Sequence, residues 1–295
     1  MILAIDTLIL GLGRIGLEHE LKKNSIKTHS KSVFFNKNFK LLCGIDTKKS
    51  RRTIYEKKYK SKAFNNLNKL PLYFSPELVI IATPTYLHKK NFQDVVKIKS
   101  VKYILIEKPI SYNYSDTKYI INICKKKNIL LFVNFIRRSN PGLVNLKKIL
   151  NNKKKNYITI YYNNGFINSG IHYLNLMKYY FGNPINLEIK KIINKTKYDF
   201  NIDVDILFKK AKIYFKFKKK IINDMIFEAE NFLLKNNKIK GFKSKKHNII
   251  INLKYYQKDV LKEILNYIKG KKSNVCLGKD HLNDMKIIKK IKNEI

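Results

Sequence analysis

Apolar and polar positions alternate in blocks through the first half of the chain. The short, continuously apolar runs at 78–82 and 103–106 are typical of strands covered on both faces of a sheet. Further strands are predicted at 7–11, 39–45 and 129–132. Stretches with helical spacing separate these strands, at 14–23, 50–60, 87–98 and 115–127. Strands that alternate with helices indicate a doubly wound parallel sheet.

The second half of the chain has a different pattern. Helices are predicted at 141–151 and 171–181, and the second ends at the stop signal Gly182-Asn183-Pro184. Segments of alternating apolar and polar residues predict strands at 157–162, 187–193, 202–208, 211–217, 224–229 and 232–235. A hairpin turn is expected at Asn236-Asn237, and helices at 257–269 and 280–293 close the chain. This pattern favours an α+β domain with a mostly antiparallel, open sheet.

The change of pattern predicts two domains. The first, residues 1–135, carries the parallel sheet, and the second, residues 136–295, carries the antiparallel one. An alternative for the last helix is that it packs back on the first domain. A chain of 295 residues with 44% apolar residues is long enough to bury two cores.

The formal net charge of +41 suggests a nucleic-acid partner, because a basic surface attracts phosphates. However, nearly all of the positive charge is lysine, spread from end to end, and arginine occurs only at positions 14, 51, 52, 137 and 138. A sequence-specific reader more often clusters its charge and uses arginine for bidentate contacts. We therefore expect no specific nucleic-acid partner, although the charge should draw anionic ligands towards any cleft.

The three cysteines, Cys43, Cys124 and Cys276, are far apart and show no C-x-x-C spacing. This argues against a structural metal site or a disulfide framework and fits a reducing compartment. The chain has no run of about 18 apolar residues and no pattern typical of a signal peptide. We expect a cytoplasmic protein with no metal and no membrane partner.

The motif Gly11-Leu12-Gly13-Arg14-Ile15-Gly16 directly follows an apolar run. A strand followed by G-x-G-x-x-G is typical of a dinucleotide-binding turn, in which the first glycine makes the turn and the second lets the backbone approach a pyrophosphate. The third glycine lets the helix pack closely on the strand. The alternative is a glycine-rich turn with a purely structural role. The motif predicts that Gly11, Gly13, Arg14, Ile15 and Gly16 contact a dinucleotide.

Asp46 ends the second predicted strand, where an acid accepts hydrogen bonds from the adenosine ribose. The usual spacing from the glycines is about 20 residues, whereas 30 separate Gly16 from Asp46, so we expect an insertion around 28–30. A carboxylate at this place repels a 2′-phosphate, which favours NAD over NADP, although Lys48, Lys49, Arg51 and Arg52 weaken this inference. The alternative is that Asp46 caps the following helix.

Two further segments follow buried strands and should lie at the same edge of the sheet. Ala82-Thr83-Pro84-Thr85-Tyr86-Leu87-His88 follows the strand at 78–82, and Glu107-Lys108-Pro109 follows the strand at 103–106. Ligands of parallel sheets bind beyond the carboxyl ends of the strands. We therefore expect Thr83, Pro84, His88 and Glu107 to contact the cofactor. A lysine at this edge can act as an acid or polarise a substrate oxygen, which makes Lys108 a catalytic candidate.

Taken together, these segments resemble the Gfo/Idh/MocA oxidoreductase family, the glucose–fructose oxidoreductase and inositol dehydrogenase group. The resemblance also includes Asn134-Phe135-Ile136-Arg137-Arg138 and His172, and it covers roughly residues 5–185. It implies a Rossmann-type nucleotide-binding domain followed by an α/β domain with an open sheet. It also implies a homo-oligomer.

The resemblance assigns the catalytic roles to Lys108 and His172. It also marks two departures, because Asn168 and Asn175 stand where many members of the family have acids. Asparagine can orient a substrate but cannot take a proton. The stretch Asn168-Ser169-Gly170-Ile171-His172 nevertheless resembles nucleotide-sugar 3-dehydrogenases of surface-polysaccharide pathways. Substrate contacts are expected from Asn168 and Asn175, and from Arg137 and Arg138, which either hold an anionic group or form structural ion pairs.

The sequence therefore predicts an NAD-dependent oxidoreductase acting on a sugar, with a nucleotide sugar as the favoured substrate class. The alternative is a catalytically silent relative that binds a dinucleotide or a sugar and has a regulatory role. The loss of acids at positions 168 and 175 favours this alternative, whereas Glu107-Lys108-Pro109 and His172 oppose it.

Overall fold

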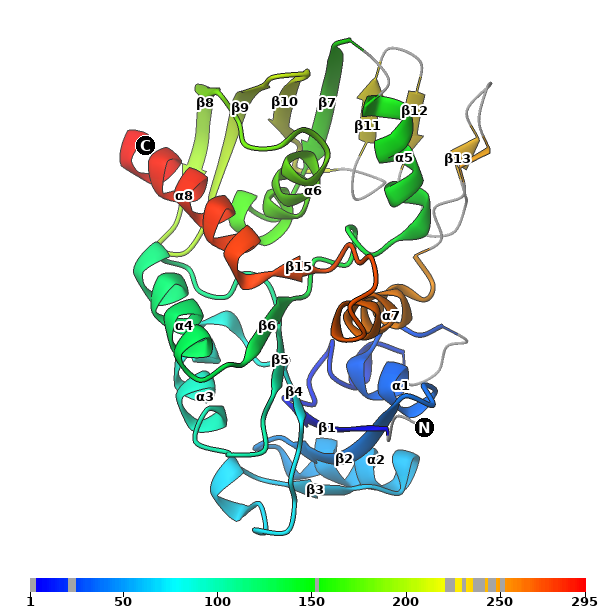
Figure 1. The fold of residues 1–295 in the computed structure, drawn as a ribbon. Coiled ribbons are helices and arrows are strands. Elements are labelled where there is room, and N and C mark those ends of the chain that lie inside the picture. Colours follow the sequence, from blue (N-terminus) through cyan, green and yellow to red (C-terminus); the bar gives the residue numbers. More distant parts are fainter. Residues whose placement is uncertain are drawn as a thin grey trace. The chain divides into compact units, whose positions relative to one another are not determined.

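The structure is a computed structural model that describes residues 4–20, 25–151, 154–220, 226–229, 232–235, 242–243, 248–249 and 253–295. The chain divides into two compact units, each described here by itself (Figure 1). Unit 1 comprises Met1–Ile136 and Lys254–Leu282, and unit 2 comprises Arg137–Leu253 and Asn283–Ile295. The expected second domain, residues 136–295, is thus interrupted by a segment that belongs to unit 1.

Unit 1 is built on a seven-stranded sheet in the order β15-β6-β5-β4-β1-β2-β3. Its strands are β1 (Ile5–Leu10), β2 (Phe39–Ile45), β3 (Lys62–Phe64), β4 (Leu78–Ile81), β5 (Tyr103–Ile106), β6 (Leu130–Val133) and β15 (Cys276–Leu277). All neighbours pair in parallel except β15, which runs antiparallel to β6. The Rossmann-type parallel sheet predicted for the first domain is therefore confirmed. Chain order reverses beside β1, which puts the crevice expected for a ligand beyond β1 and β4.

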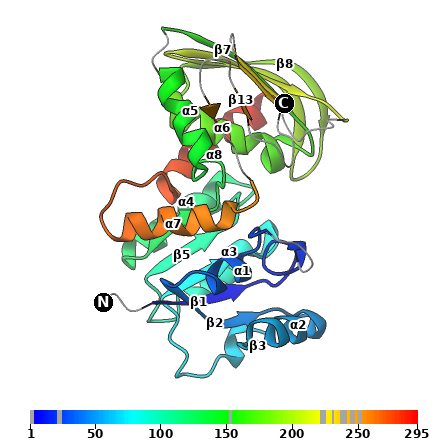
Figure 2. The same cartoon turned by 90° about the vertical axis from the view of Figure 1, so that its right-hand side faces the viewer.

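The apolar runs of β4 and β5 are buried on both faces, as predicted for central parallel strands. The helices of unit 1 are α1 (His29–Phe34), α2 (Lys49–Tyr59), α3 (His88–Val95), α4 (Tyr114–Lys126) and α7 (Tyr256–Ile268). Helix α7 packs against α1, and its Val260, Leu261 and Ile264 join the core formed by one face of the sheet (Figure 2). This packing explains why the segment from Lys254 returns to unit 1.

The first helix differs most from the prediction. No continuous helix covers 14–23: the described residues form helical turns, the last at Glu18–Glu20, and helix α1 begins only at His29. The backbone N–H groups of His29 and Ser30 donate to the carbonyls of Ile15 and Gly16. In an uninterrupted helix these carbonyls bond residues four positions later, so α1 resumes the first helix after an excursion of about ten residues.

Unit 2 contains a six-stranded, mostly antiparallel sheet in the order β12-β11-β7-β10-β9-β8. Its strands are β7 (Asn156–Tyr162), β8 (Asn186–Lys195), β9 (Phe200–Phe208), β10 (Ala211–Phe217), β11 (Ile226–Ala229) and β12 (Phe232–Lys235). Only β10 and β7 pair in parallel. A separate pair is formed by β13 (Phe242–Lys243) and β14 (Asn248–Ile249). The turn expected at Asn236-Asn237 lies outside the described residues.

One face of this sheet is buried. Burial alternates with period two along β9, which leaves Ile202, Val204 and Ile206 inside. Two helices of the same unit lie near that face, α5 (Pro141–Asn151) and α6 (Ile171–Phe181), and the hydroxyl of Tyr180 on α6 donates to the carbonyl of Leu143 on α5 (Figure 2). The division between the units falls inside the last helix, α8 (Gly278–Glu294).

Candidate cofactor cleft and catalytic residues

Unit 1 has a cleft of about 990 Å³ at the carboxyl ends of β1, β2 and β4. The lining includes much of the predicted cofactor set, namely Gly11, Gly13, Arg14, Ile15, Asp46, Thr83 and Pro84. It also includes His19 and, from helix α7, Tyr256. The structure thus brings three separate segments of the sequence to one crevice, at the point where parallel sheets bind their ligands.

The glycines of the turn have distinct roles. Gly11 has φ +102°, and a side chain there would lie 2.9 Å from the backbone of Ala82. A side chain at Gly16 would collide with the carbonyl of Gly11. The three atoms nearest to a Cβ at Gly13 would all belong to the guanidinium of Arg51, the first at 3.6 Å, and Gly13 lines the cleft. Gly11 and Gly16 therefore allow the tight turn, and Gly13 leaves room for a pyrophosphate at the backbone, which fits a dinucleotide.

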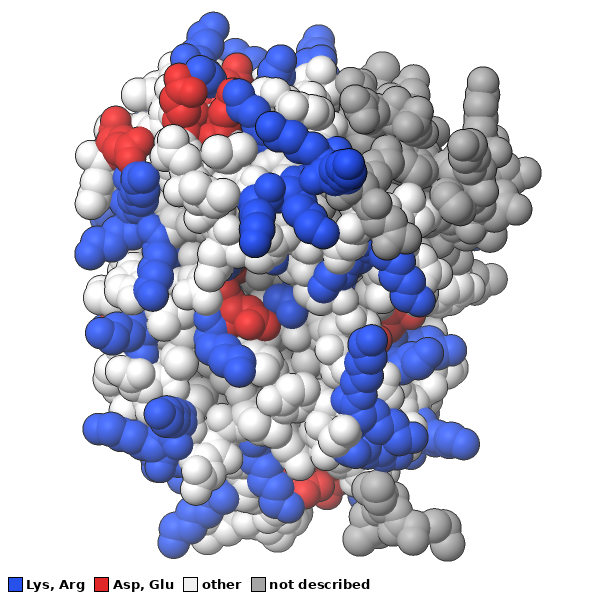
Figure 3. All heavy atoms as spheres, turned by 45° about the horizontal axis from the view of Figure 1, so that its top comes forward, with Lys and Arg blue, Asp and Glu red and all other residues white. Residues whose placement is uncertain are grey.

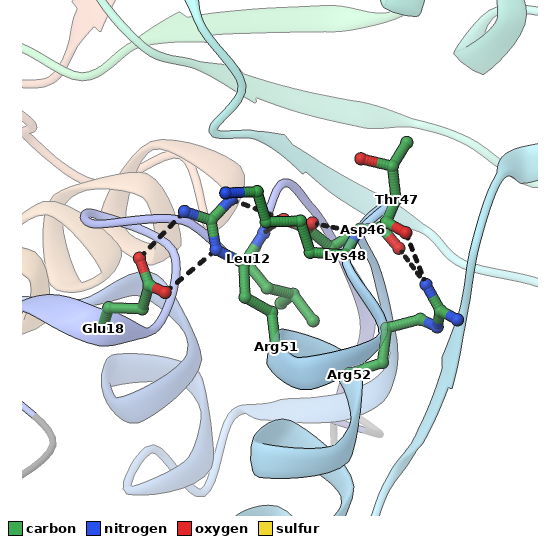
Figure 4. Close-up of polar contacts among 7 residues, drawn as sticks. All are labelled: Leu12, Glu18, Asp46, Thr47, Lys48, Arg51 and Arg52. Atoms are coloured by element: carbon green, nitrogen blue, oxygen red, sulfur yellow. Dashed lines mark hydrogen bonds and ion pairs between the residues drawn. The ribbon is translucent and has the colours of Figure 1, made fainter.

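The carboxylate of Asp46 lies at the end of β2 and is held by two backbone groups (Figure 4). Its Oδ2 accepts from the N–H of Leu12 at 2.9 Å, and its Oδ1 accepts from the N–H of Lys48 at 2.8 Å. The first bond ties the glycine turn to β2, and the second lies at the start of α2. Asp46 therefore fixes the turn and borders the cleft, and its contact with a ribose stays a prediction.

His88 is placed differently from the prediction. Its side chain is completely buried and is not among those that line the cleft. Nε2 lies 2.8 Å from the carbonyl oxygen of Thr83, and Nδ1 lies 3.1 and 3.2 Å from those of Pro109 and Ile110. Burial lowers the pKa of His88, although these carbonyl contacts oppose the shift. The ring therefore connects the loop after β4 to the loop that follows Lys108 and lies outside the lining of the cleft.

Glu107 is also turned towards protein groups. Its Oε1 accepts from His29 Nε2 at 2.8 Å and from Asn134 Nδ2 at 2.6 Å. Burial alone would raise the pKa of Glu107, but the bonds from His29 and Asn134 and the charge of Lys108 hold it below its usual value. The carboxylate is therefore ionised and anchors the residue immediately before Lys108.

Lys108 is half-buried at the carboxyl end of β5, and a cis peptide bond joins it to Pro109. The loop that follows is held from two sides. His88 lies against its carbonyls, and the N–H of Ile110 donates to Nε2 of His281, which is buried at the start of α8. Two buried histidines and the Glu107 contacts thus restrict the backbone on either side of Lys108, as expected for a residue that must be positioned.

His172 lies in unit 2, at the second position of α6, and is half-buried. It follows a π-type helical turn at Phe166–Gly170, which contains the exposed Asn168. The N–H groups of Ile167 and Asn168 donate to the carboxylate of Asp199, at 2.8 and 3.0 Å. Asp199 therefore fixes the backbone of the turn that precedes His172. Lys108 and His172 belong to different units, so their joint action stays a prediction.

Asn175, expected to contact substrate, is buried inside unit 2. Its Nδ2 donates to Asp284 Oδ2 at 2.6 Å, and Lys178 Nζ lies 2.7 Å from the other oxygen of the same carboxylate. Asp284 is fully buried on α8. These contacts give Asn175 a structural role, linking α6 to α8.

The paired arginines at the start of unit 2 lie over tyrosines of α6. The guanidinium of Arg137 is 4.8 Å from the ring centre of Tyr173, and that of Arg138 is 4.7 Å from that of Tyr179. Such contacts stabilise planar cations on aromatic faces. They provide a structural reason for both arginines, and an anion-binding role for them stays a prediction.

Several contact residues were missed by the sequence reasoning: Glu18, His29, Asp199, His281 and Asp284. Each makes its contact with a residue more than 30 positions away in the chain. Only His29 had a local signal, because the excess spacing between Gly16 and Asp46 pointed to an insertion near it. Among the described residues, no group of three or more His, Cys, Asp or Glu side chains is arranged to hold a metal ion, and no helix is long and apolar enough to cross a membrane.

Comparison with known proteins agrees with this geometry. Residues 5–135 match the oxidoreductase family with an NAD-binding Rossmann fold. This segment therefore matches the NAD-binding domain of the Gfo/Idh/MocA family. The resemblance inferred from the motifs is therefore confirmed, and the match ends within two residues of the point where unit 1 first ends.

A curated relative is myo-inositol 2-dehydrogenase of Thermotoga maritima. It is 27% identical over 145 residues, which cover 49% of this chain and 40% of the relative. The chain thus aligns with less than half the length of this curated relative.

Solved structures resemble the whole chain. An oxidoreductase from Bacillus subtilis, yvaA, has a TM-score of 0.75 at 16% identity, covering 98% of this chain and 95% of that one. The WlbA dehydrogenase of Bordetella pertussis, solved with NADH and UDP-GlcNAcA, has a TM-score of 0.72 at 15% identity, covering 97% and 94%. At these identities the comparisons show the fold alone, and they confirm the two-part architecture.

Proposed function

We propose that the chain is an NAD-dependent oxidoreductase that acts on a secondary alcohol of a sugar. The observation that carries this proposal is the cleft of unit 1, where the backbone of Gly13 and the carboxylate of Asp46 lie together. The turn formed by Gly11 and Gly16 would hold the pyrophosphate at the backbone of Gly13, and Asp46 would accept from the adenosine ribose. The nicotinamide ring supplies the hydride chemistry when it is bound.

The chain's own residues would supply the proton chemistry. Lys108 Nζ would bind the oxygen of the reacting carbon and exchange its proton, helped by the restraint on the backbone before and after it. His172 would share this proton transfer from unit 2. Asn168 can orient a hydroxyl but cannot take its proton, and the buried contacts of Asn175 remove it from this work.

A nucleotide sugar is the substrate class that we favour, in a pathway of polysaccharide synthesis. The support is the similarity of the stretch 168–172 to nucleotide-sugar dehydrogenases and the fold shared with WlbA, which was solved with UDP-GlcNAcA. Arg137 and Arg138 supply cations at the start of the same unit, where a diphosphate could be held. A cytoplasmic location and a homo-oligomer complete the proposal.

The second candidate function is a catalytically silent dinucleotide- or sugar-binding protein. It is favoured by one observation, that Asn168 and Asn175 replace acids and that Asn175 is committed to Asp284. Native mass spectrometry of the purified protein, followed by turnover assays with NAD and a panel of sugars and nucleotide sugars, separates the two. Turnover of any sugar supports the enzyme, whereas dinucleotide binding without turnover across the panel supports the silent relative.

A further inference from the structure

The rim of the cleft beside Asp46 carries acidic and basic side chains whose effects on the choice between NAD(H) and NADP(H) oppose each other. A carboxylate there disfavours the 2′-phosphate of NADP(H), yet the next helix begins with Lys48, Lys49, Arg51 and Arg52. An arginine in this position has the geometry to grip a phosphate bidentately. The cofactor preference therefore depends on what holds these arginines.

Arg51 is held by two carboxylates (Figure 4). Its Nε and Nη2 donate to the two oxygens of Glu18, at 2.9 and 3.1 Å, and its Nη1 lies 3.5 Å from Asp46 Oδ2. The bond to Glu18 is the largest cause of a raised pKa for Arg51. The Nε–Nη2 edge of the guanidinium, which could bind a phosphate through two hydrogen bonds, is therefore occupied by Glu18.

Arg52 is engaged differently. Its Nη1 donates to the carbonyl oxygens of Asp46 and Thr47, at 2.8 and 2.9 Å. It therefore caps the end of β2 and lies outside the lining of the cleft, whereas Arg51 is part of that lining. Arg51 is thus the arginine on α2 that could act on a bound cofactor.

Glu18 reaches Arg51 because of the interrupted helix. It lies in the last described turn before the excursion, and its N–H donates to the carbonyl of Gly13 at 3.1 Å. The acid is therefore fixed to the glycine turn itself. Glu18 and Asp46 place two negative charges around the guanidinium of Arg51, which more than balance the charge of this one arginine.

We propose that Glu18 is a specificity-determining residue that disfavours NADP(H) by occupying the phosphate-binding edge of Arg51. This inference rests on the proposed function, because it requires a dinucleotide in the cleft. Two effects would then disfavour NADP(H). The carboxylate of Asp46 repels the 2′-phosphate, and Glu18 binds Arg51, which would otherwise attract it.

The test is isothermal titration of NADH and NADPH into Glu18→Gln. The substitution keeps the shape of the side chain and removes its charge, so Arg51 becomes available. We expect NADPH to bind roughly tenfold more tightly, as for one added charge-assisted contact, and the Kd of NADH to change less than about threefold. In the double variant Glu18→Gln/Arg51→Gln the gain should disappear.

Glu77→Gln is the matched control, because Glu77 pairs with Lys102 outside the cleft and its loss changes the net charge equally. An unchanged NADPH affinity in Glu18→Gln, an equal gain for both cofactors, or a gain that survives removal of Arg51 would overturn the inference. Arg51→Gln alone gives a second measurement: a large loss of NADPH affinity would show that Arg51 already reads the phosphate. Failure of the unaltered protein to bind NADH would instead overturn the proposed function.

Discussion

Glu107 keeps its charge in a buried place because His29 and Asn134 donate to the same oxygen. The pKa of Glu107 is lowered from its ordinary value of 4.5. A depressed folded-state pKa contributes stability that is present above that ordinary value and lost as the pH falls through the folded value. The contacts of Glu107 are therefore a source of stability at neutral pH and a weak point in acid.

Glu107→Gln should lower the free energy of unfolding by about 2 kcal/mol at pH 7, the usual value of a hydrogen bond to a charged group. The difference from the unaltered protein should shrink as the pH falls below 4.5. Urea unfolding followed by circular dichroism at pH 7 and pH 3.5 measures this. Glu77→Gln, at an exposed ion pair, should have little effect. A difference that does not vary with pH would contradict the role given to the ionised carboxylate.

Lys108 and His172 are the residues on which the proposed chemistry depends. Lys108→Ala and His172→Ala should each lower kcat by roughly 10²- to 10⁴-fold, the range for a positioned acid or base. The Kd of NADH should change little, because the glycine turn and Asp46 carry that binding. Lys118→Ala, at an exposed lysine of α4, is the control. Full activity of Lys108→Ala would remove the core of the mechanism.

Asn168→Asp tests the most informative departure from the family pattern. If Asn168 only orients the sugar, a new carboxylate should leave kcat unchanged or lower it. A gain of tenfold or more would indicate that a base has been lost at this place and that the chain is a decayed dehydrogenase. Steady-state kinetics on the best substrate of the panel decide between these outcomes.

At the scale of elements, the interruption of the first helix predicts how the protein responds when the residues between its two parts are deleted. Removing residues 19–28 should join Glu18 directly to His29 in one continuous helix, because His29 already bonds the carbonyl of Ile15. The variant should fold and keep His29 against Glu107, and NADH titration measures the effect of losing His19 from the cleft lining. Removing residues 19–27 instead adds one residue to the helix and rotates His29 by about 100° away from Glu107.

Circular dichroism and NADH titration compare the two deletions. The ten-residue deletion should resemble the unaltered protein, and the nine-residue deletion should be less stable. Equal loss of folding in both would show that the excursion itself is needed for the unit.

Elements that depend on local pattern were predictable, and those that depend on distant contacts were not. The strands at 78–82 and 103–106 were found because central parallel strands are apolar on both faces. The helix at 14–23 was wrong, because its glycine start was correct but its continuation lies ten residues further along. The two-residue strand β15 has no periodicity of its own, and its pairing with β6 alone defines it.

The candidate site follows the same rule. Gly11, Gly13 and Asp46 were expected at one crevice because consecutive residues and strand ends indicate it, and the structure places all three in the lining of one cleft. The protein contacts of His88 and Asn175 were not predicted, since nothing local shows that the ring of His88 would face three carbonyls or that the amide of Asn175 would meet Asp284. Burial at these two positions is decided by segments about 20 and more than 100 residues away.

At the scale of the whole molecule, the positive charge is spread widely. Lysines and arginines are scattered over the face shown in Figure 3, with the few acids between them. Many of the described acids are paired with lysine or arginine, including buried Asp284 and half-buried Asp116. The excess charge is therefore carried by lysines distributed over the surface, which is the arrangement expected of general compositional bias.

Such a surface should bind DNA weakly and without sequence preference. Dispersed lysines release counterions from the phosphate backbone but do not read base edges, so affinity should fall steeply as salt rises from 50 to 200 mM. Fluorescence anisotropy with two duplexes of equal length and unrelated sequence, at several salt concentrations, measures this. NADH at saturating concentration should leave the binding unchanged, since the cleft occupies a small part of the basic surface. A complex that prefers one sequence and survives physiological salt would show that the charge of +41 serves nucleic-acid recognition after all.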